Sequence, residues 1–380
     1  MGIIFIKKTE NYDVDRLTDI IKEGFEKLGG MEKFISKGDT VLLKPNCLLG
    51  VMPNTGIVTH PEFIRAVIRV IKPAAGRILI GDSPGFGSYK AAAAKNGTKK
   101  AAEEEGAEII EFRSGALIKT QNRMMYGEYP LDREVLKADK IINLPKLKTH
   151  MLMYMTLCVK NMFGVIPGIR KIEYHAKAEK SRYDFAKMLV ELYMAKKPVV
   201  NIVDGILGLH GNGPGTDGKP IKTNMVIMGE DGFEMDMFIP SLVGLDPEKV
   251  NTNEVYIKEV LKEKKSDIII KGDNPETLKV KFEPPLGEPT ASAFRGMINF
   301  FRGHGTAKPV FAEKNCTGCE VCVSHCPVNV LTHTVKDKKG AAVHKIVCDY
   351  DRCIRCFCCH EMCPERAIEI KKPFLSYIFK

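Results

Sequence analysis

Eight of the twelve cysteines lie near the C-terminus, in two copies of the pattern Cys-x-x-Cys-x-x-Cys-x-x-x-Cys-Pro. Where this spacing binds iron and sulfide, three closely spaced thiolates hold one [4Fe–4S] cluster, and the fourth cysteine of the run ligates the other cluster. We therefore expect two [4Fe–4S] clusters, with their ligands crossed between the runs: Cys316, Cys319, Cys322 and Cys363 for the first, and Cys353, Cys356, Cys359 and Cys326 for the second. The pattern predicts a unit that handles single electrons, but it does not identify a reaction.

The composition is that of an ordinary globular protein, with 380 residues, 44% hydrophobic residues, 27% charged residues and no tryptophan. This length allows two or three domains. The net charge of +10 is compatible with nucleic acid, an acidic protein or an anionic small molecule as partner. The lysines are spread along the chain with little aromatic interleaving, so we expect no nucleic-acid binding.

The use of cysteine favours a reducing compartment. Secreted disulfide frameworks occur in small domains, whereas these cysteines are clustered at metal-ligand spacing in a long chain. The apolar run at the N-terminus is too short for a signal peptide. No apolar stretch approaches the roughly 18 residues that suggest a membrane span. We expect a cytoplasmic protein without a transmembrane segment.

Short β-rich runs alternate with amphipathic stretches over about the first 280 residues. This alternation predicts an α/β fold, a mostly parallel sheet with helices on both faces. The expected strands are at 3–6, 40–43, 77–80, 108–112, 140–144, 199–203, 224–228 and 268–270, and the expected helices are at 15–27, 61–71, 89–105, 181–196 and 253–264. We expect four segments: the α/β domain at 1–282, a linker and connecting helix at 283–305, a small α+β unit of the bacterial ferredoxin type at 306–371, and a tail at 372–380.

Polar motifs follow several of the predicted strands. Ligands of open α/β sheets bind at the carboxyl ends of the strands, so we expect these motifs to converge on one cleft. Lysines would make it electropositive and suited to carboxylate or phosphate. The expected substrate-binding residues are Lys44, Asn46, Asp82, Ser83, Lys146, Lys148, Lys160 and Asn161.

Histidines beside these motifs are candidates for proton transfer, because imidazole titrates near physiological pH. We expect His150 or His175 to transfer protons and Asp204 to orient one of them. The turn at 81–85 is neither a Walker motif nor a dinucleotide fingerprint, so neither ATP nor NAD is predicted.

Four cysteines lie outside the two runs, namely Cys47, Cys158, Cys348 and Cys358. Cys358 adjoins Cys359, but only Cys359 keeps the spacing of the pattern. Core packing is the favoured role of Cys47, Cys158 and Cys348. Cys47 and Cys158 remain open as nucleophiles, should neighbouring charge lower their thiol pKa values.

Several motifs together resemble a known family. They are VLLKPN at 41–46, THP at 59–61, GDSP at 81–84, NLPKLKTH at 143–150, VKNMFG at 159–164, and DG at 204–205 followed by GPG at 213–215. These motifs, in this order, resemble the DUF362 family, which is often fused to a 4Fe–4S ferredoxin module. The resemblance covers roughly residues 40–370. It implies cluster binding and an anaerobic, cytoplasmic setting, and it leaves the activity open. One departure is His60, where the family leads us to expect an acidic residue.

Three functions fit these observations. The first is a redox enzyme that takes electrons from a soluble carrier protein and passes them to an anionic small molecule in the lysine-lined cleft. The second is a non-catalytic electron-transfer or docking subunit of another enzyme. In the third, the clusters are structural or sensing, and the α/β domain performs non-redox chemistry.

Overall fold

The computed structural model describes residues 2–85, 87–113, 115–121, 123–168, 171, 174, 182–262, 267–285, 308–338, 341–353 and 355–371. Most of the expected linker and connecting helix, the tail at 372–380, and His175 lie outside these residues.

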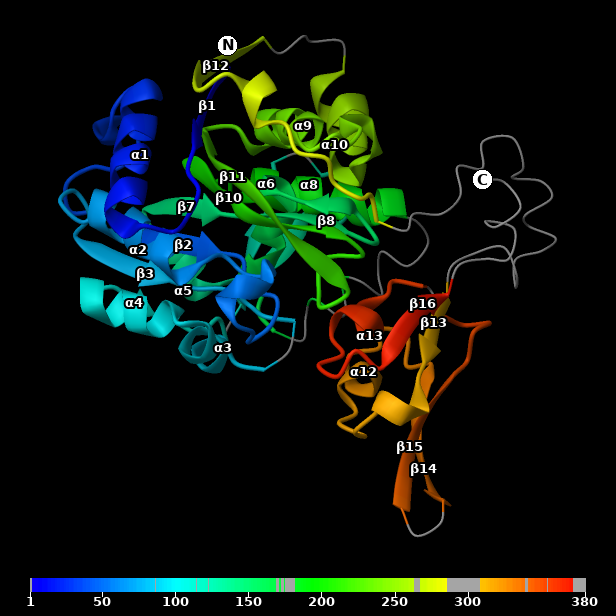
Figure 1. Ribbon diagram of the computed structural model, residues 1–380. Coiled ribbons are helices and arrows are strands. Elements are labelled where there is room, and N and C mark those ends of the chain that lie inside the picture. Colours follow the sequence, from blue (N-terminus) through cyan, green and yellow to red (C-terminus); the bar gives the residue numbers. More distant parts are fainter. Residues whose placement is uncertain are drawn as a thin grey trace.

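A ten-stranded sheet forms the centre of the larger part of the molecule (Figure 1). Its main path runs β12 (Ile268–Gly272), β1 (Gly2–Lys8), β11 (Gly218–Gly229), β10 (Val200–Gly211), β7 (Lys140–Leu144), β2 (Thr40–Pro45), β3 (Arg77–Ile80) and β4 (Glu108–Ile109). β8 (Lys146–His150) pairs with β10 and with β9 (Tyr154–Thr156). Six of the strand pairs are parallel. The three antiparallel pairs are β1–β11, β10–β11 and β8–β9, so each of them includes β11 or β9. The predicted mostly parallel sheet is confirmed.

Helices cover both faces of this sheet, as the alternation of side chains along β2 demonstrates. Val41 and Leu43 pack in the core that includes α1 (Val14–Lys27) and α2 (Pro61–Ile71). Leu42 between them points to the opposite face and packs in the core that includes α8 (Arg182–Ala195). Successive strand residues face opposite sides, so a strand buried on both faces is apolar throughout. The other helices of this part are α3 (Tyr89–Asn96), α4 (Thr98–Glu105), α5 (Arg133–Lys137), α6 (Cys158–Asn161), α9 (Gly232–Leu242) and α10 (Asn251–Val255).

Local differences from the predicted elements have local causes. The single helix expected at 89–105 is broken into α3 and α4 at Gly97, whose φ of 88° lies in the left-handed region that favours glycine. The helix expected at 253–264 continues from α10 as one π-helical segment, Tyr256–Leu261. A small hairpin of β5 (Gly115–Lys119) and β6 (Glu128–Asp132) was not predicted.

The C-terminal part is small and has two similar halves. β13 (Lys308–Phe311) pairs with β16 (Ile368–Lys371), and β14 (Leu331–Lys338) pairs with β15 (Ala341–Cys348), both antiparallel. Each cysteine run contains one short helix, α12 (Val321–Ser324) or α13 (Cys358–Glu361). Each helix is preceded by a non-glycine residue in the left-handed region, Glu320 (φ 57°) and Phe357 (φ 60°). The internal repeat of the sequence is therefore also a repeat of backbone conformation.

The C-terminal part lies against the α/β part through α12 and α13, and its β14–β15 hairpin extends away from it (Figure 1). Met362 packs with Leu48, Leu49 and Val321 in an apolar cluster that spans both parts. His360 Nε2 lies 3.3 Å from Asp217 Oδ2. A side chain at Gly215 would begin 2.9 Å from the backbone oxygen of Glu361. The close approach of α13 therefore depends on glycine at that position.

Candidate functional site

Two small cavities in the C-terminal part are each lined by four cysteines. One is lined by Cys316, Cys319, Cys322 and Cys363, and the other by Cys326, Cys353, Cys356 and Cys359. Each quartet takes three cysteines from one run and one from the other, which is the grouping expected from the spacing. The fold thus brings together both predicted sets.

The chemistry of these quartets fits an iron–sulfur cluster. The backbone N–H of Val330 donates to Cys326 Sγ at 3.4 Å, and the backbone N–H of Ala367 donates to Cys363 Sγ at 3.2 Å. Burial, followed by the negative charge of neighbouring thiolates, raises the pKa of the Cys322 thiol to about 12. Four crowded thiolates require positive charge among them, which iron ions supply.

The four other cysteines do not join these quartets. Cys358 lines a different, larger cavity, as does Cys47. Burial raises the pKa values of the Cys47 and Cys158 thiols above the ordinary range. Both thiols therefore stay protonated, which favours the packing role over the nucleophilic one. Cys348 is half-buried beside Cys353.

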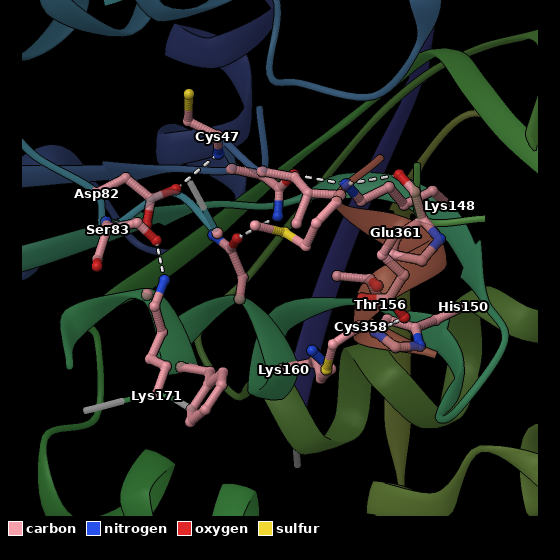
Figure 2. Close-up of a pocket in the computed structure, with 18 of the residues that line it drawn as sticks. Cys47, Asp82, Ser83, Lys148, His150, Thr156, Lys160, Lys171, Cys358 and Glu361 are labelled. Atoms are coloured by element: carbon pink, nitrogen blue, oxygen red, sulfur yellow. Dashed lines mark hydrogen bonds and ion pairs between the residues drawn. The ribbon is translucent and has the colours of Figure 1, made fainter. Parts of the chain in front are cut away.

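The larger cavity, of about 120 Å³, lies between the α/β part and the C-terminal part (Figure 2). The α/β part contributes all but one of the predicted substrate-binding residues: Lys44, Asn46, Asp82, Ser83, Lys148, Lys160 and Asn161, together with His150. The C-terminal part contributes His325, Pro327, Cys358, Glu361 and Met362. The exception is Lys146. Three of the cavity's contributors, His325, Pro327 and Cys358, adjoin cysteines of the second quartet in the sequence.

The sheet explains why these residues meet. Lys44 lies near the carboxyl end of β2, and Asp82 follows the end of β3, the parallel neighbour of β2. Lys148 and His150 are alternate residues of β8 and share one face of that strand. Strands that run in parallel bring the residues after their carboxyl ends to one edge of the sheet.

A buried ion pair forms part of the cavity wall. Lys44 Nζ lies 2.8 Å from Asp82 Oδ1, and both side chains are almost fully buried. Asp82 also accepts hydrogen bonds from the backbone N–H groups of Cys47 at 2.6 Å and Ser83 at 2.7 Å. The Asp82 carboxylate thus ties the turn after β3 to the segment 44–47 at the end of β2.

The cavity is also lined by Lys148, Lys160 and Lys171. None of these three lysines has a carboxylate within ion-pair distance among the described residues. Lys148 Nζ donates to Asn46 Oδ1 at 2.8 Å and to the backbone oxygens of Ile57 at 2.7 Å and Pro214 at 3.5 Å. Lys171 Nζ donates to the backbone oxygens of Ser83 and Pro84.

Lys160 Nζ lies over the aromatic rings of Phe163 and Phe185, at 5.6 and 5.8 Å from their centres. Burial is the largest cause of a lowered pKa in all three lysines: about 7 for Lys148, about 8 for Lys171, and a lowered value for Lys160. The positive charge of Lys160 lowers the pKa of Lys148 further.

His150 presents one ring nitrogen to the cavity. Its Nδ1 accepts from the backbone N–H groups of Leu152 at 3.1 Å and Met153 at 3.3 Å. A nitrogen that accepts carries no proton, so the proton of the neutral ring is at Nε2. His150 Nε2 lies 3.7 Å from Glu361 Oε1. Burial raises the pKa of the Glu361 carboxyl to about 7, and its Oε1 has no hydrogen-bond partner among the described residues.

The structure does not bring Lys146 and Asp204 to this cavity, contrary to expectation. Lys146 Nζ lies 2.7 Å from Asp204 Oδ2, and both side chains are fully buried. Tyr12 donates its hydroxyl proton to Asp204 Oδ1 at 2.9 Å, and Lys146 Nζ donates to the Tyr12 hydroxyl at 2.9 Å. The register between β8 and β10 shifts between Asp204 and Leu209, which separates Lys146 from Lys148. Asp204 accepts from the backbone N–H of His60, whereas the Nδ1 of His150 is held by backbone N–H groups and His175 lies outside the described residues.

Glu361, Cys358, Thr156 and Lys171 line the cavity although none was among the predicted site residues. Glu361 lies between two cysteines of the second run, where the spacing identifies metal ligands but not the direction of the intervening side chains. The signal that could have indicated Lys171 was its place beside His175 in the polar segment after Asn161.

Comparisons with known proteins agree with the two parts of the chain. Residues 41–241, more than half of the chain, match the family described as "Domain of unknown function (DUF362)", and residues 315–367 match "4Fe-4S dicluster domain". The chain is 36% identical over 249 residues to a thylakoid-associated protein, sll1697, of Synechocystis sp.; the match covers 66% of this chain and 77% of that protein.

A solved structure, the lactate racemase apoprotein of Thermoanaerobacterium thermosaccharolyticum, is similar over 53% of this chain and 50% of that one, with a TM-score of 0.37 and 15% identity. None of the helices in the described ranges has the length and apolar character needed to cross a membrane. The matches show that this chain is a member of the DUF362 family that carries a 4Fe–4S ferredoxin-type domain at its C-terminal end.

Proposed function

We propose that the protein is an iron–sulfur reductase that holds an anionic small molecule in the cavity between its two parts. One observation carries the proposal. Basic and amide side chains of the DUF362 domain line the cavity together with five residues of the C-terminal part, and three of these five, His325, Pro327 and Cys358, adjoin cysteines of the second quartet. A molecule bound there would lie beside the electron-carrying unit.

The two cysteine quartets would hold two [4Fe–4S] clusters, with the ligand sets given above. When bound, the clusters would supply electrons one at a time. Pro327 lines both the second quartet's cavity and the large cavity, whereas no residue is shared with the cavity of the first quartet. Cys319 of the first quartet is exposed. This arrangement favours the first quartet as the side that a soluble electron carrier approaches.

The protein's own residues would position the molecule and supply a proton. Lys160 and Lys171 have ammonium protons available for an anionic group, and Lys148 adds positive charge at close range. His150 lines the cavity, and the proton of its neutral ring is on Nε2, so the imidazole is the candidate that would donate a proton to a reduced product. The Lys44–Asp82 pair fixes the wall. The cysteine pattern supports a reducing cytoplasm as the place of this activity, and the resemblance to the DUF362 family supports an anaerobic setting.

The proposal is tested with an anaerobic small-molecule extract of cells that produce the protein. Cluster-loaded protein is reduced with dithionite, freed of excess reductant and mixed with the extract, and the return of the visible cluster absorption is followed. The double variant Lys148→Met/Lys160→Met should be reoxidised about tenfold more slowly or worse, with unchanged cluster absorption. Lys100→Met, at an exposed position on α4, is the matched control. Equal rates for the double variant and the wild type would contradict the proposal.

A second candidate is an electron-transfer subunit without a substrate of its own. The exposure of Cys319, and the thylakoid association that the name of the Synechocystis relative states, favour it. In that case neither lysine substitution would alter reoxidation, and an added protein acceptor would reoxidise all variants equally. If reduction changes no interaction with either kind of partner, a structural role of the clusters is favoured instead.

A further inference from the structure

We propose that the cavity binds a compact dianion, a dicarboxylate or a phosphate monoester of about ten non-hydrogen atoms or fewer. This inference rests on the proposed function and names the class of molecule that it would act on. Charge, free hydrogen-bond donors and size each support it.

The side chains that line the cavity include two more basic residues than acidic ones, counting lysine, aspartate and glutamate. Four lysines face it, and the carboxylates of Asp82 and Glu361 are the acidic side chains that line it. With all four lysines protonated and both carboxylates ionised, two positive charges remain without a carboxylate partner among the residues that line the cavity. Lys44 is neutralised locally by Asp82 at 2.8 Å, so the surplus lies with Lys148, Lys160 and Lys171. Buried positive charge without a counterion is unfavourable, and an anion of matching charge relieves it.

The hydrogen-bond inventory indicates which lysines contact the dianion directly. The three ammonium protons of Lys148 already face three oxygens. Among the described residues Lys171 uses two donors on backbone oxygens, and Lys160 contacts only aromatic rings. An ammonium group has three donors. Lys160 is therefore the first direct ligand and Lys171 the second, and Lys148 acts through its charge.

The size of the cavity limits what can bind. A single water needs roughly 10–15 Å³ of such space, so 120 Å³ holds about ten water-sized groups. Nucleotides and dinucleotides are far larger. Leu48, Phe163 and Met362 add apolar surface to the wall, which restricts water around the bound molecule and strengthens its attraction to the lysines.

Four probes test the inference by isothermal titration calorimetry on the anaerobic, cluster-loaded protein. Succinate and glycerol 3-phosphate represent the two kinds of compact dianion, butyrate is a monoanion of similar length, and ATP is oversized. At least one compact dianion should bind about tenfold or more tightly than butyrate, and ATP should not bind at the cavity. Which dianion binds distinguishes carboxylate from phosphate as the preferred group.

Two variants assign the binding to the cavity. Lys160→Met should weaken the binding of the preferred dianion about tenfold or more, and the exposed control Lys100→Met should leave it unchanged. Circular dichroism and the cluster absorption confirm that each variant is folded and loaded. The inference is overturned if neither dianion binds at 10 mM (about the weakest binding that the titration detects), if butyrate or ATP binds equally well, or if Lys160→Met has no effect.

The outcome of the binding titrations can be distinguished from the outcome of the reoxidation experiment that tests the proposed function. If no compact dianion binds while the small-molecule extract still reoxidises the wild type faster than the lysine double variant, the reductase stands and the substrate class is wrong. If a dianion binds at Lys160 while the extract reoxidises both proteins equally, the site stands and the reductase does not.

Discussion

The lowered pKa of Lys148 leads to a prediction of how ligand affinity depends on pH. This pKa is about 7 because burial and the neighbouring Lys160 disfavour the charged ammonium, and Lys146, Asp82 and Glu361 are the other charged groups that act on it. A bound dianion favours the charged ammonium, so binding should take up a proton above pH 7. The affinity for the preferred dianion should fall as pH rises from 7 to 9, by up to about tenfold per unit.

Titration calorimetry at several pH values, in buffers of different ionisation enthalpy, measures both the affinity and the proton uptake. Lys148→Met should bind more weakly at pH 7, and its affinity should depend less on pH. Lys171, with a pKa of about 8, accounts for the pH dependence that remains. An affinity that is constant from pH 7 to 9, without proton uptake, would show that neither lysine changes its protonation on binding.

Asp82 should be a determinant of stability as well as of the site. Asp82→Asn leaves the Lys44 ammonium buried without its counterion, and breaking a buried pair in this way destabilises proteins by about 3–5 kcal/mol. Urea unfolding, followed by circular dichroism, gives the free energy of unfolding. Lys258→Met, which removes an exposed pair with Glu254 on the surface, is the control and should change stability by less than about 1 kcal/mol. Equal effects of the two substitutions would refute the role of the Lys44–Asp82 pair.

Single residues also show how far the sequence predicts the site. Lys44 and Lys148 were predicted to line the cleft because they lie in polar motifs after predicted strands, and Lys160 because it lies in a further polar segment, and each lines the cavity. Lys146 satisfies the same rule, but its ammonium is held by Asp204 and Tyr12. Such a pairing depends on a register shift and on a distant tyrosine, and neither leaves a signal in the local sequence pattern.

The short helix α13 is the element on which both proposals converge. It carries Cys359 of the second quartet, it ends two residues before Cys363 of the first, and its Cys358 and Glu361 line the large cavity. A helix that carries both a cysteine of the second quartet and two residues of the cavity wall couples their geometry. Its two adjacent cysteines therefore have different expected roles, and substitution separates them.

Cys359→Ser should lose one cluster, and Cys358→Ser should keep both. Anaerobic iron and sulfide analysis should give about eight of each per chain for the wild type and Cys358→Ser, and about four for Cys359→Ser. The reverse result would place Cys358 in the ligand set and shift the register of the second run by one residue.

The elements themselves differ in how well they were predicted. Buried strands such as β2 and β7 were found close to their actual bounds because they are continuous apolar runs, and helices such as α1 and α2 because their apolar residues recur with the helical period. β8 and β9 were missed, because their buried polar residues interrupt the apolar pattern. The functional segment is thus the part that the hydrophobic pattern predicts least well.

For the whole molecule, the sequence predicts the two parts but not how they meet. The cysteine spacing identifies the ferredoxin-type unit, and strand–helix alternation identifies the α/β domain. Their contact depends on small features such as Gly215 and the Met362 cluster, which no local pattern marks. The cavity is formed by that contact, so the position of Glu361 in its wall could be assigned only from the structure.

The central claim is that electrons leave through the second quartet to a molecule in the cavity. The most direct test compares Cys356→Ser, which should lose only the second cluster, with Cys319→Ser, which should lose only the first. Each protein is reduced with dithionite, and its reoxidation by the anaerobic small-molecule extract is timed. We predict that Cys356→Ser is reoxidised about tenfold more slowly than Cys319→Ser or worse. Reoxidation of Cys356→Ser as fast as that of the wild type would contradict the account.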